Sequence, residues 1–590
     1  MLRFLLLLFC CNSLLLTAQT DTTYTDFSDS MDVSLVYRVN LSNQGLTELP
    51  AKLLECSNLT QLNLSNNELS ILPDELGKMA NLEELFLDNN HLEDLPKTFK
   101  ELKKLTLLSM NNALWTSNPN VVINDLVKNT NLKSLFLRNN ELTVLPNGLK
   151  NWKMLKTLEL GNNDLQTLPN NTSKLPALYA LGLNNNPNLD FDDAFEKLAA
   201  LKTLRKITVS YNNLTKVPKP LMDCRYLQFL DLSHNNLEEL PERMTQLIRL
   251  RTLYTSYNQI TSLSEAFSLL ENLTNWDLNY NQLTSLPMGM GMMTELTTLS
   301  VNSNQITELP NNLRNLSNLQ VFDIGNNPIQ KINFDLTKFK DLQTINLEGL
   351  NLSIVTAEWL NSWKQLNTLN LANNPELDWA TLLPAIAQQT ALMKLNLAAN
   401  NLTQLPDTLK NCSILMELNL SGNSALNTAE TWALLPQFPT LSRLYLQEMD
   451  LKEMPEALAQ CKGLDYLDCS KNPVDQIPDT WVELPVLKTL QLSETDISTV
   501  PSNLARYPSL QFLHLAKCKN IQTKLLLEHL KNVPLYELDL QESTLEAFPE
   551  EWTAIAANKL ILTGCNLEAD LLTEIEEGLP YTTIVSEAQE

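Results

Sequence analysis

The chain has 590 residues, of which 43 are basic and 68 acidic, and its formal net charge is −25. This balance argues against a nucleic-acid partner, because the phosphates would be repelled by the acidic surface. Two interpretations stay open, a surface that attracts a cationic partner and an acidic surface that is merely solvated. A chain of this length commonly contains several domains, so its repeats must decide the organisation.

Residues 1–19, MLRFLLLLFCCNSLLLTAQ, combine an early basic residue, an apolar run and small residues at the end. This pattern predicts a secretory signal peptide, and the apolar run is too short for a membrane-spanning helix. We expect cleavage near residues 18–20. Lipidation at Cys10 or Cys11 is the alternative, although the apolar run continues beyond both cysteines. Residues 20–35 should form a short N-terminal lead and cap.

From residue 36 to residue 567 one pattern recurs 23 times, and most copies are 23 residues apart. Examples are LNLSNNELSILP from Leu62, LFLRNNELTVLP from Leu135 and LDLSHNNLEELP from Leu230. A period in the twenties with this L-x-x-L-x-L-x-x-N-x-L arrangement indicates a solenoid. The repeats therefore predict one elongated array, followed at residues 568–590 by a C-terminal cap with a helix at 568–579 and a last strand at 582–586.

Each repeat should contain one short strand, because its apolar residues alternate with polar ones. Leu62 and Leu64 are expected to point inward, and the polar residues between them outward. An Asn such as Asn67 recurs three residues after the second leucine. Burying a polar side chain without a partner is costly, so these amides should form a ladder that bonds the backbones of adjacent turns. Ala113 and Met449, which replace the Asn, predict local irregularity, as does Leu350.

The outer segments of the repeats differ in length. Most follow a Pro nine residues after the second leucine, which suits an extended turn because Pro has a fixed φ and no N–H. Five longer repeats should carry true short helices instead, as in FDDAFEKLAAL from Phe191 and TKLLLEHLKNV from Thr523. Seven cysteines follow the leader, all at packing or ladder positions, and we expect buried free thiols rather than disulfides.

The pattern resembles the leucine-rich-repeat family, in the class with LPxxLxxLxxL outer segments. The resemblance implies an α/β fold, a right-handed horseshoe-shaped solenoid with a parallel sheet on the concave face and short helices and extended turns on the convex face. It is specific for the fold and only weakly specific for function. This class includes many secreted bacterial proteins and some intracellular eukaryotic scaffolds. The leader, and the lack of cysteine-rich end caps, favour the exported bacterial type.

The outward residues of the predicted sheet hold the main candidates for partner binding. Two residues after the second leucine, four consecutive repeats carry Tyr211, His234, Tyr257 and Tyr280. One residue before it, the neighbouring row contains Asp231, Tyr254, Asp277, Ser300 and Asp323. We expect the rings to stack at one edge of the concave face. Tyrosines beside carboxylates predict a site for a basic peptide or protein loop. Alternatively, Tyr is tolerated at a half-exposed edge and packs on its neighbours.

A second candidate row lies further along the same face, at Asn346, Asn370, Asn396 and Asn419. These amides could bond a glycan or an extended chain. The alternative is ordinary polar filling of a solvated sheet. Trp276 occupies an inward position of its strand, and the other tryptophans considered as sugar platforms lie on outer segments, so we expect them to pack in the core or on the convex side.

No catalytic, cofactor or metal site is predicted. His514 and Asp539 should be neighbours in an exposed contact, but Ser493 lies diagonally at about 7–8 Å, too far for a Ser–His pair, and nothing supplies an oxyanion hole. Asp231 and Asp277 should lie about 9–10 Å apart. Ca²⁺ ligands approach within about 2.3–2.6 Å, so the two carboxylates are not expected to share an ion.

The sequence thus predicts a non-enzymatic module, secreted or at the cell surface or in the periplasm, without a transmembrane helix. It should bind a protein or peptide partner on its concave face. Adhesion, host contact or envelope assembly is suggested by family analogy alone. A carbohydrate-binding surface protein is the first alternative, for which the Asn row would matter more than the Tyr row. A structural spacer without a ligand is the second.

Overall fold

The computed structural model describes residues 22–26, 32–115, 118–350, 355–531, 533–546, 552 and 554–586. The predicted signal peptide at residues 1–19 lies outside these residues, and so does part of the predicted lead at residues 20–35. The chain divides into two compact units, Met1–Leu296 and Thr297–Glu590. Each unit is a solenoid of short coils, and each is described by itself.

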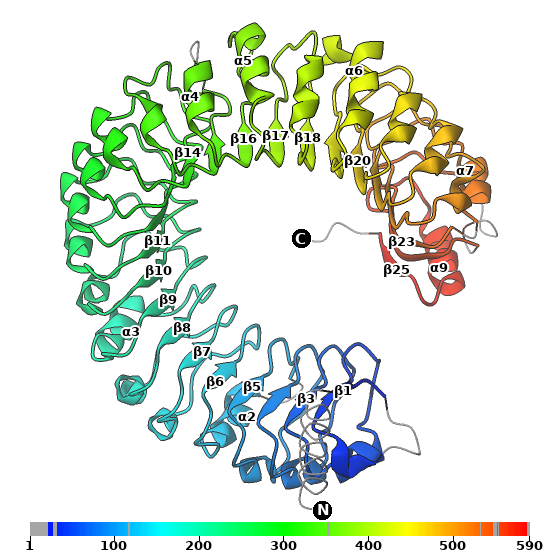
Figure 1. The fold of residues 1–590 in the computed structure, drawn as a ribbon. Helices are drawn as coiled ribbons and strands as arrows, with labels where there is room; N and C mark the ends of the chain where they lie inside the picture. Colours follow the sequence, from blue (N-terminus) through cyan, green and yellow to red (C-terminus); the bar gives the residue numbers. More distant parts are fainter. Residues whose placement is uncertain are drawn as a thin grey trace, which may run out of the picture. The chain divides into compact units, whose positions relative to one another are not determined.

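The first unit contains a parallel sheet in which consecutive strands pair in chain order. Two helices, α2 (Pro119–Leu126) and α3 (Phe191–Leu198), lie on its outer side (Figure 1). The strands are β1 (Thr23–Tyr24), β2 (Arg38–Asn40), β3 (Gln61–Asn63), β4 (Glu84–Phe86), β5 (Leu107–Ser109), β6 (Ser134–Phe136), β7 (Thr157–Glu159), β8 (Ala180–Gly182), β9 (Lys206–Thr208), β10 (Phe229–Asp231), β11 (Thr252–Tyr254) and β12 (Asn275–Asp277).

The second unit repeats this arrangement with its own parallel pairings. Its strands are β13 (Thr298–Ser300), β14 (Val321–Asp323), β15 (Thr344–Asn346), β16 (Thr368–Asn370), β17 (Lys394–Asn396), β18 (Glu417–Asn419), β19 (Arg443–Tyr445), β20 (Tyr466–Asp468), β21 (Thr489–Gln491), β22 (Phe512–His514), β23 (Leu535–Asp539), β24 (Ala557–Ile561) and β25 (Thr583–Val585). The helices within its described residues include α4 (Ala357–Ser362), α5 (Trp379–Ile386), α6 (Ala429–Leu434), α7 (Thr523–Leu530) and α9 (Ala569–Gly578).

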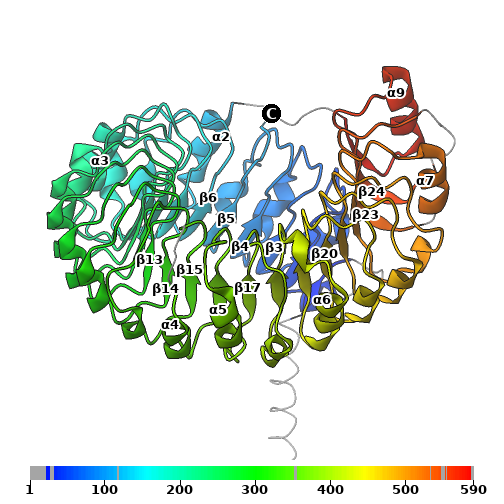
Figure 2. The same cartoon turned by 90° about the horizontal axis from the view of Figure 1, so that it is seen from above.

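In each unit the strands line the concave side and the helices the convex side (Figures 1 and 2). The five repeats predicted to carry helices contain α2, α3, α5, α6 and α7, which confirms that expectation. Shorter repeats use 3-10 turns after the Pro, such as Asp74–Lys78. α4 was not predicted, since its repeat is barely longer than the others. The predicted α/β solenoid architecture is confirmed within each unit.

The core is a continuous stack of inward leucines, because Leu62, Leu64 and their counterparts are almost fully buried. Trp276 is buried in the same layer, and its ring centroid lies 5.6 Å from that of Phe267. The seven cysteines after the leader are free thiols, six of them buried and Cys565 half-buried. These positions agree with the packing roles expected from the sequence.

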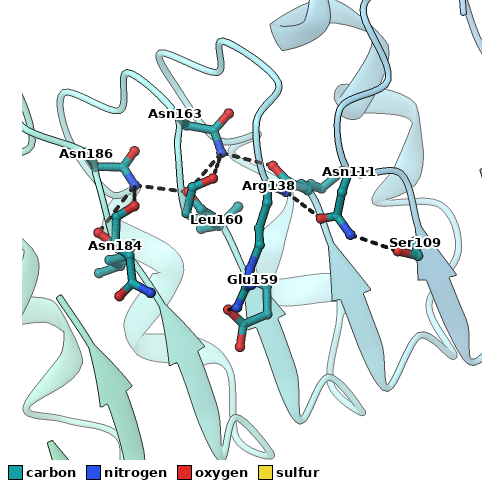
Figure 3. Close-up of polar contacts among 11 residues, drawn as sticks. Ser109, Asn111, Arg138, Glu159, Leu160, Asn163, Asn184 and Asn186 are labelled. Carbon is teal, nitrogen blue, oxygen red and sulfur yellow. Dashed lines mark hydrogen bonds and ion pairs between the residues drawn. The ribbon is translucent and has the colours of Figure 1, made fainter. Parts of the chain in front are cut away.

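The buried Asn residues form the predicted ladder, which Figure 3 shows around Asn163. The Nδ2 of Asn163 donates to the carbonyl oxygens of Leu137 at 2.9 Å and Leu160 at 2.8 Å. Its Oδ1 accepts from the backbone N–H groups of Asn140 and Leu142, each at 3.0 Å. One side chain therefore joins the backbones of two successive turns.

The ladder continues where the Asn is absent. The hydroxyls of Thr495 and Ser543 donate to carbonyl oxygens at 2.7 and 2.8 Å, and the Cys565 thiol does so at 3.0 Å. At Ala113 and Met449, the Asn of the next repeat bonds both the backbone N–H and an upstream carbonyl. The irregularity expected at these two residues does not appear in the hydrogen bonding. At Leu350 the residues that follow, 351–354, lie outside the described chain.

Candidate functional site

The turn that follows each strand has the same backbone conformation in successive repeats. The residue two after the second leucine has a positive φ in successive repeats, and we call these residues the turn row. Asn occupies it in the early repeats, as at Asn66 (φ 57°) and Asn89 (φ 53°). Asn tolerates this left-handed conformation better than most residues. The amides of Asn89, Asn112 and Asn139 each donate to the preceding Asn of the row, at 2.5–2.8 Å.

After β9–β12, aromatic residues replace Asn in the turn row. They are Tyr211 (φ 60°), His234 (φ 51°), Tyr257 (φ 54°) and Tyr280 (φ 52°). Consecutive ring centroids are 4.1, 4.2 and 4.2 Å apart, with planes inclined by 10°, 10° and 12°. The four rings thus form one continuous stack, here called the aromatic stack, as expected from the sequence.

The three tyrosines of the stack are exposed, because Tyr211, Tyr257 and Tyr280 are 53%, 44% and 48% exposed, whereas His234 is half-buried. The faces of the two inner rings, His234 and Tyr257, are covered by their neighbours in the stack, so these rings offer their edges to solvent.

The aromatic stack is difficult to explain by stability alone. A left-handed residue other than Gly or Asn costs roughly 1–2 kcal/mol, whereas an aromatic pair contributes only about 0.5–1.5 kcal/mol. Stacking therefore only partly offsets the strain at three tyrosines. Ser303 and Ala399 hold the same position of their repeats with φ 54°, so the positive φ is a property of the repeat and does not by itself separate a binding role from tolerance of Tyr at this edge.

A second group of side chains lies on the strands beneath the stack. The rings of Phe229 on β10 and Tyr254 on β11 meet edge to face, with centroids 5.3 Å apart and planes at 83°. The ammonium nitrogen of Lys206 on β9 lies 4.7 Å from the Phe229 ring centroid, a cation–π distance. Partial burial and then the charges of Asp277 and Asp231 raise the pKa of Tyr254, so its hydroxyl stays protonated.

The carboxylates of the predicted site have a local structural role that sequence analysis missed. The Oδ1 of Asp231 accepts from the backbone N–H of Ser233 at 2.9 Å, and that of Asp277 accepts from Asn279 at 3.0 Å. Asp323 makes the same contact with Gly325 at 3.2 Å, but in the second unit. Such Asx turns pre-set the tight turn after the strand. Each aspartate therefore stabilises the bend that presents the turn row.

The second candidate row has the same role. In each of these four residues the amide oxygen accepts from the backbone N–H two residues ahead, at 3.0–3.1 Å: Asn346, Asn370, Asn396 and Asn419. The Asn370 amide also donates to Glu348 at 2.9 Å. The amide oxygens of this row therefore cap the turns that follow the strands.

The His–Asp pair is present but not exposed, which corrects the sequence expectation. His514 Nδ1 lies 3.5 Å from Asp539 Oδ2 and its Nε2 lies 3.8 Å from Glu537 Oε1, with side chains only 15–16% exposed. Within the described residues, Ser493 is not a hydrogen-bond partner of His514. The same part of the chain holds no cluster of three His, Cys, Asp or Glu residues suited to a metal ion.

One concave-face pair escaped sequence analysis. Arg138 Nη2 and Glu159 Oε2 are 2.7 Å apart (Figure 3). Glu159 lies over Gly182, where an added Cβ would be 2.0 Å from its Oε2, so Gly at this position makes room for the carboxylate. The sequence signal was an Arg directly after the second leucine of one repeat (Arg138, after Leu137) and a Glu directly before the second leucine of the next repeat (Glu159, before Leu160).

These coils, with one short parallel strand, a buried Asn ladder and an outer turn or helix each, define a parallel repeat solenoid of known type. Family profiles match at residues 34–92 (Leucine rich repeat), 294–338 (Leucine Rich repeats, 2 copies), and 131–152 and 226–247 (Leucine Rich Repeat). The chain is a leucine-rich-repeat protein. No curated protein matches it.

Several solved structures are similar in fold. A leucine-rich-repeat protein of Leptospira interrogans is 21% identical, with 96% of this chain and 99% of that chain covered and a TM-score of 0.26. TLR13 in complex with ssRNA13 is 20% identical, with 96% and 94% covered and a TM-score of 0.49. An internalin (inlF) of Listeria monocytogenes is 21% identical, with 60% and 93% covered and a TM-score of 0.41. Likenesses at this level carry no inference about ligands.

Proposed function

We propose that the protein is a non-enzymatic binding module that takes a protein or peptide partner on the concave face of its first unit, over β9–β12. The observation that carries this proposal is the aromatic stack, three exposed tyrosines and the half-buried His234, held at left-handed positions where the early repeats have Asn. Solenoids of this kind use their concave surface for binding. Exposed aromatic residues on a rigid scaffold are frequent anchors of protein interfaces.

The chemistry of this surface favours an extended, cationic partner. Ring edges carry the positive end of the aromatic quadrupole and phenol hydroxyls can donate or accept, so the stack suits the carbonyl groups of an extended backbone. Asp231 ends β10 and Asp277 ends β12, two of the strands that precede the aromatic stack. Their negative charges would attract Lys or Arg side chains of that partner. Phe229 and Tyr254 add apolar area on the same face.

A catalytic role is not proposed. The half-buried His514 contacts two carboxylates on β23, and an open sheet does not exclude water from a reaction. A pair of this kind stabilises the local fold of the sheet.

The test is affinity capture with Tyr211→Asn, Tyr257→Asn and Tyr280→Asn combined in one variant. Asn is the residue that the early repeats carry in the turn row, so this variant keeps the backbone and removes the aromatic stack. The matched control is Tyr179→Asn with Tyr536→Asn, because those tyrosines are 51% and 54% exposed away from the turn row. We expect a partner retained by wild type and control and lost from the stack variant. A partner retained by all three would refute this site, and glycan capture alone would favour a carbohydrate-binding protein.

Export is proposed on the residues of the leader, MLRFLLLLFCCNSLLLTAQ. Outside the cytoplasm, adhesion or contact with a host or envelope component is the role we propose for the module. Among the described residues, no helix has the length and apolar character needed to cross a bilayer. Mass spectrometry of the secreted chain tests the leader, since cleavage near residue 19 should leave an unmodified N-terminus. An acylated N-terminal Cys would instead establish the lipoprotein alternative, and an intact leader would refute export by this route.

A further inference from the structure

The turn row has a third composition in the second unit. After β19–β23 it holds alternating charges, and we call these residues the charged row: Glu448, Lys471, Glu494, Lys517 and Glu542. All five have positive φ, between 52° and 58°. As in the aromatic stack, residues poorly suited to this conformation replace Asn. The five residues project from consecutive turns of one parallel sheet, whose strands are spaced at about 4.7–4.9 Å.

Ion pairing within the row is incomplete. Lys471 pairs with Glu448 at 2.9 Å and Lys517 pairs with Glu542 at 3.8 Å. Among the described residues, the carboxylate of Glu494, at the centre of the row, has no cation within ion-pair distance. Its charge still acts on its neighbour, because Glu448 and, more weakly, Glu494 raise the pKa of Lys471. The two lysines of the row thus pair with Glu448 and Glu542, and the carboxylate of Glu494 is left over.

The row is accessible and borders a hollow. The paired side chains are 46–59% exposed, and Glu494 is also exposed. A hollow of about 640 Å³ lies along the row and is lined by its first four members together with Asp496 and Lys519. Side chains of an incoming surface therefore have room beside the row, which a flat surface would not provide.

We propose that the charged row is a self-association surface, on which a second copy of this chain pairs its own charged row in the opposite direction. An alternating row is complementary to itself under a two-fold axis, the symmetry of most homodimers. With the axis between Lys471 and Glu494, Glu494 meets Lys471 of the second copy, and Glu448 meets Lys517 of the second copy. Each of these contacts occurs twice, and the central carboxylate gains a cation.

The alternation of charges also allows two copies of an acidic chain to approach each other. A chain at −25 should repel its own copy, unless the surfaces in contact are locally balanced. The four residues that meet across the axis, two glutamates and two lysines, form such a surface. Because exposed ion pairs are individually weak, we expect a dimer that forms at low ionic strength and dissociates in salt. This surface lies in the second unit and does not depend on the proposed partner site.

Sedimentation equilibrium of the purified chain tests the proposal. Wild type should be dimeric at about 0.02 M salt and monomeric at about 0.5 M, where the screening length is far shorter than the interface. Lys471→Glu with Lys517→Glu makes the row fully acidic, and Glu448→Lys, Glu494→Lys and Glu542→Lys make it fully basic. Each variant alone should weaken association by about tenfold or more, and a mixture of the two should form a mixed dimer.

The control carries the same change of net charge as the acidic row variant, placed elsewhere in the second unit. Lys410→Glu with Lys462→Glu removes two ion pairs outside the turn row and should leave the dimer intact. Circular dichroism establishes that every variant is folded. A wild type that stays monomeric at low salt overturns the proposal. So does a dimer that persists in both row variants, or a mixture of the two that fails to associate.

Discussion

The rings of His234 and Tyr257 lie face to face, with centroids 4.2 Å apart and planes inclined by 10°. They project from left-handed residues in consecutive turns. Neither ring alone would favour this backbone, and together they only partly offset its strain. The contact therefore connects a backbone property, the positive φ of the turn row, to a surface property, the aromatic stack.

Replacing Tyr257 by Asn and by Ala should separate these two contributions. Tyr257→Asn loses two stacking contacts but relieves the strain, so we expect the free energy of unfolding to stay within about 1 kcal/mol of wild type. Tyr257→Ala loses the contacts and keeps the strain, and should be destabilised by about 1–3 kcal/mol. Urea unfolding of both variants measures the difference. A Tyr257→Asn variant no more stable than Tyr257→Ala would refute the strain at this position, because both variants have lost the stacking contacts.

The buried ladder should be far more sensitive than the exposed turn row beside it. Asn163 makes hydrogen bonds to both neighbouring turns, and its loss leaves buried backbone groups without partners. We expect Asn163→Ala to cost about 3 kcal/mol or more, and Asn163→Cys less, since Cys565 takes the ladder position in its own repeat.

Hydrogen exchange at the Asn140 and Leu142 amides locates the effect, because both donate to Asn163. The matched control is Asn162→Gly, one residue earlier at an exposed left-handed position (φ 54°), where Gly is well tolerated. Equal losses in the two variants would mean that the ladder does not carry the stability of these turns.

Much of the fold followed from the sequence because its causes are local and repeated. The alternation around Leu62 fixed the strand, the buried Asn67 required a bonding partner, and the extra residues near Phe191 allowed a helix. The aromatic stack was foreseen for the same reason, since Tyr211 and Tyr257 occupy the same position of different repeats. The repeat period alone fixes which residues of different repeats occupy equivalent positions, and therefore lie side by side.

The features that sequence analysis missed depend either on backbone dihedral angles or on contacts between residues at different positions of the repeat. Besides the binding role predicted for it, Asp231 caps a turn through its bond to Ser233, a role that only the backbone conformation reveals. Arg138 and Glu159 pair across two different rows, so following one row at a time does not bring them together. The recurring Asn at positions such as Asn66 was the available signal for the left-handed turn.

Acid should weaken the contact between Asp539 and His514. Burial alone would raise the pKa of Asp539, but hydrogen bonds from His514 and from the Gln541 N–H outweigh it and hold the pKa below its usual value. A depressed folded pKa contributes stability above the unfolded value of about 3.9, and this contribution is lost as pH falls through the folded value.

The stability difference between wild type and Asp539→Asn isolates that carboxylate from the other acidic groups. We expect the difference to be constant near neutral pH and to shrink between about pH 5 and pH 2. Urea unfolding across this range is the measurement. A difference that grows on acidification would mean that the pKa of Asp539 is raised rather than lowered in the folded chain.

Thiol reactivity tests the packing of the repeats throughout the chain. Burial raises the pKa of Cys224 and Cys461 to about 12, and of Cys56 and Cys412 to about 11. The thiolate is the reactive form, so the folded chain should be nearly inert to iodoacetamide at about pH 8. The half-buried Cys565 should be the first of the seven to react, and all seven should react in denaturant. Mass spectrometry of timed samples measures this order, and rapid native alkylation of Cys224 or Cys461 would refute the packing of the outer segments in which they lie.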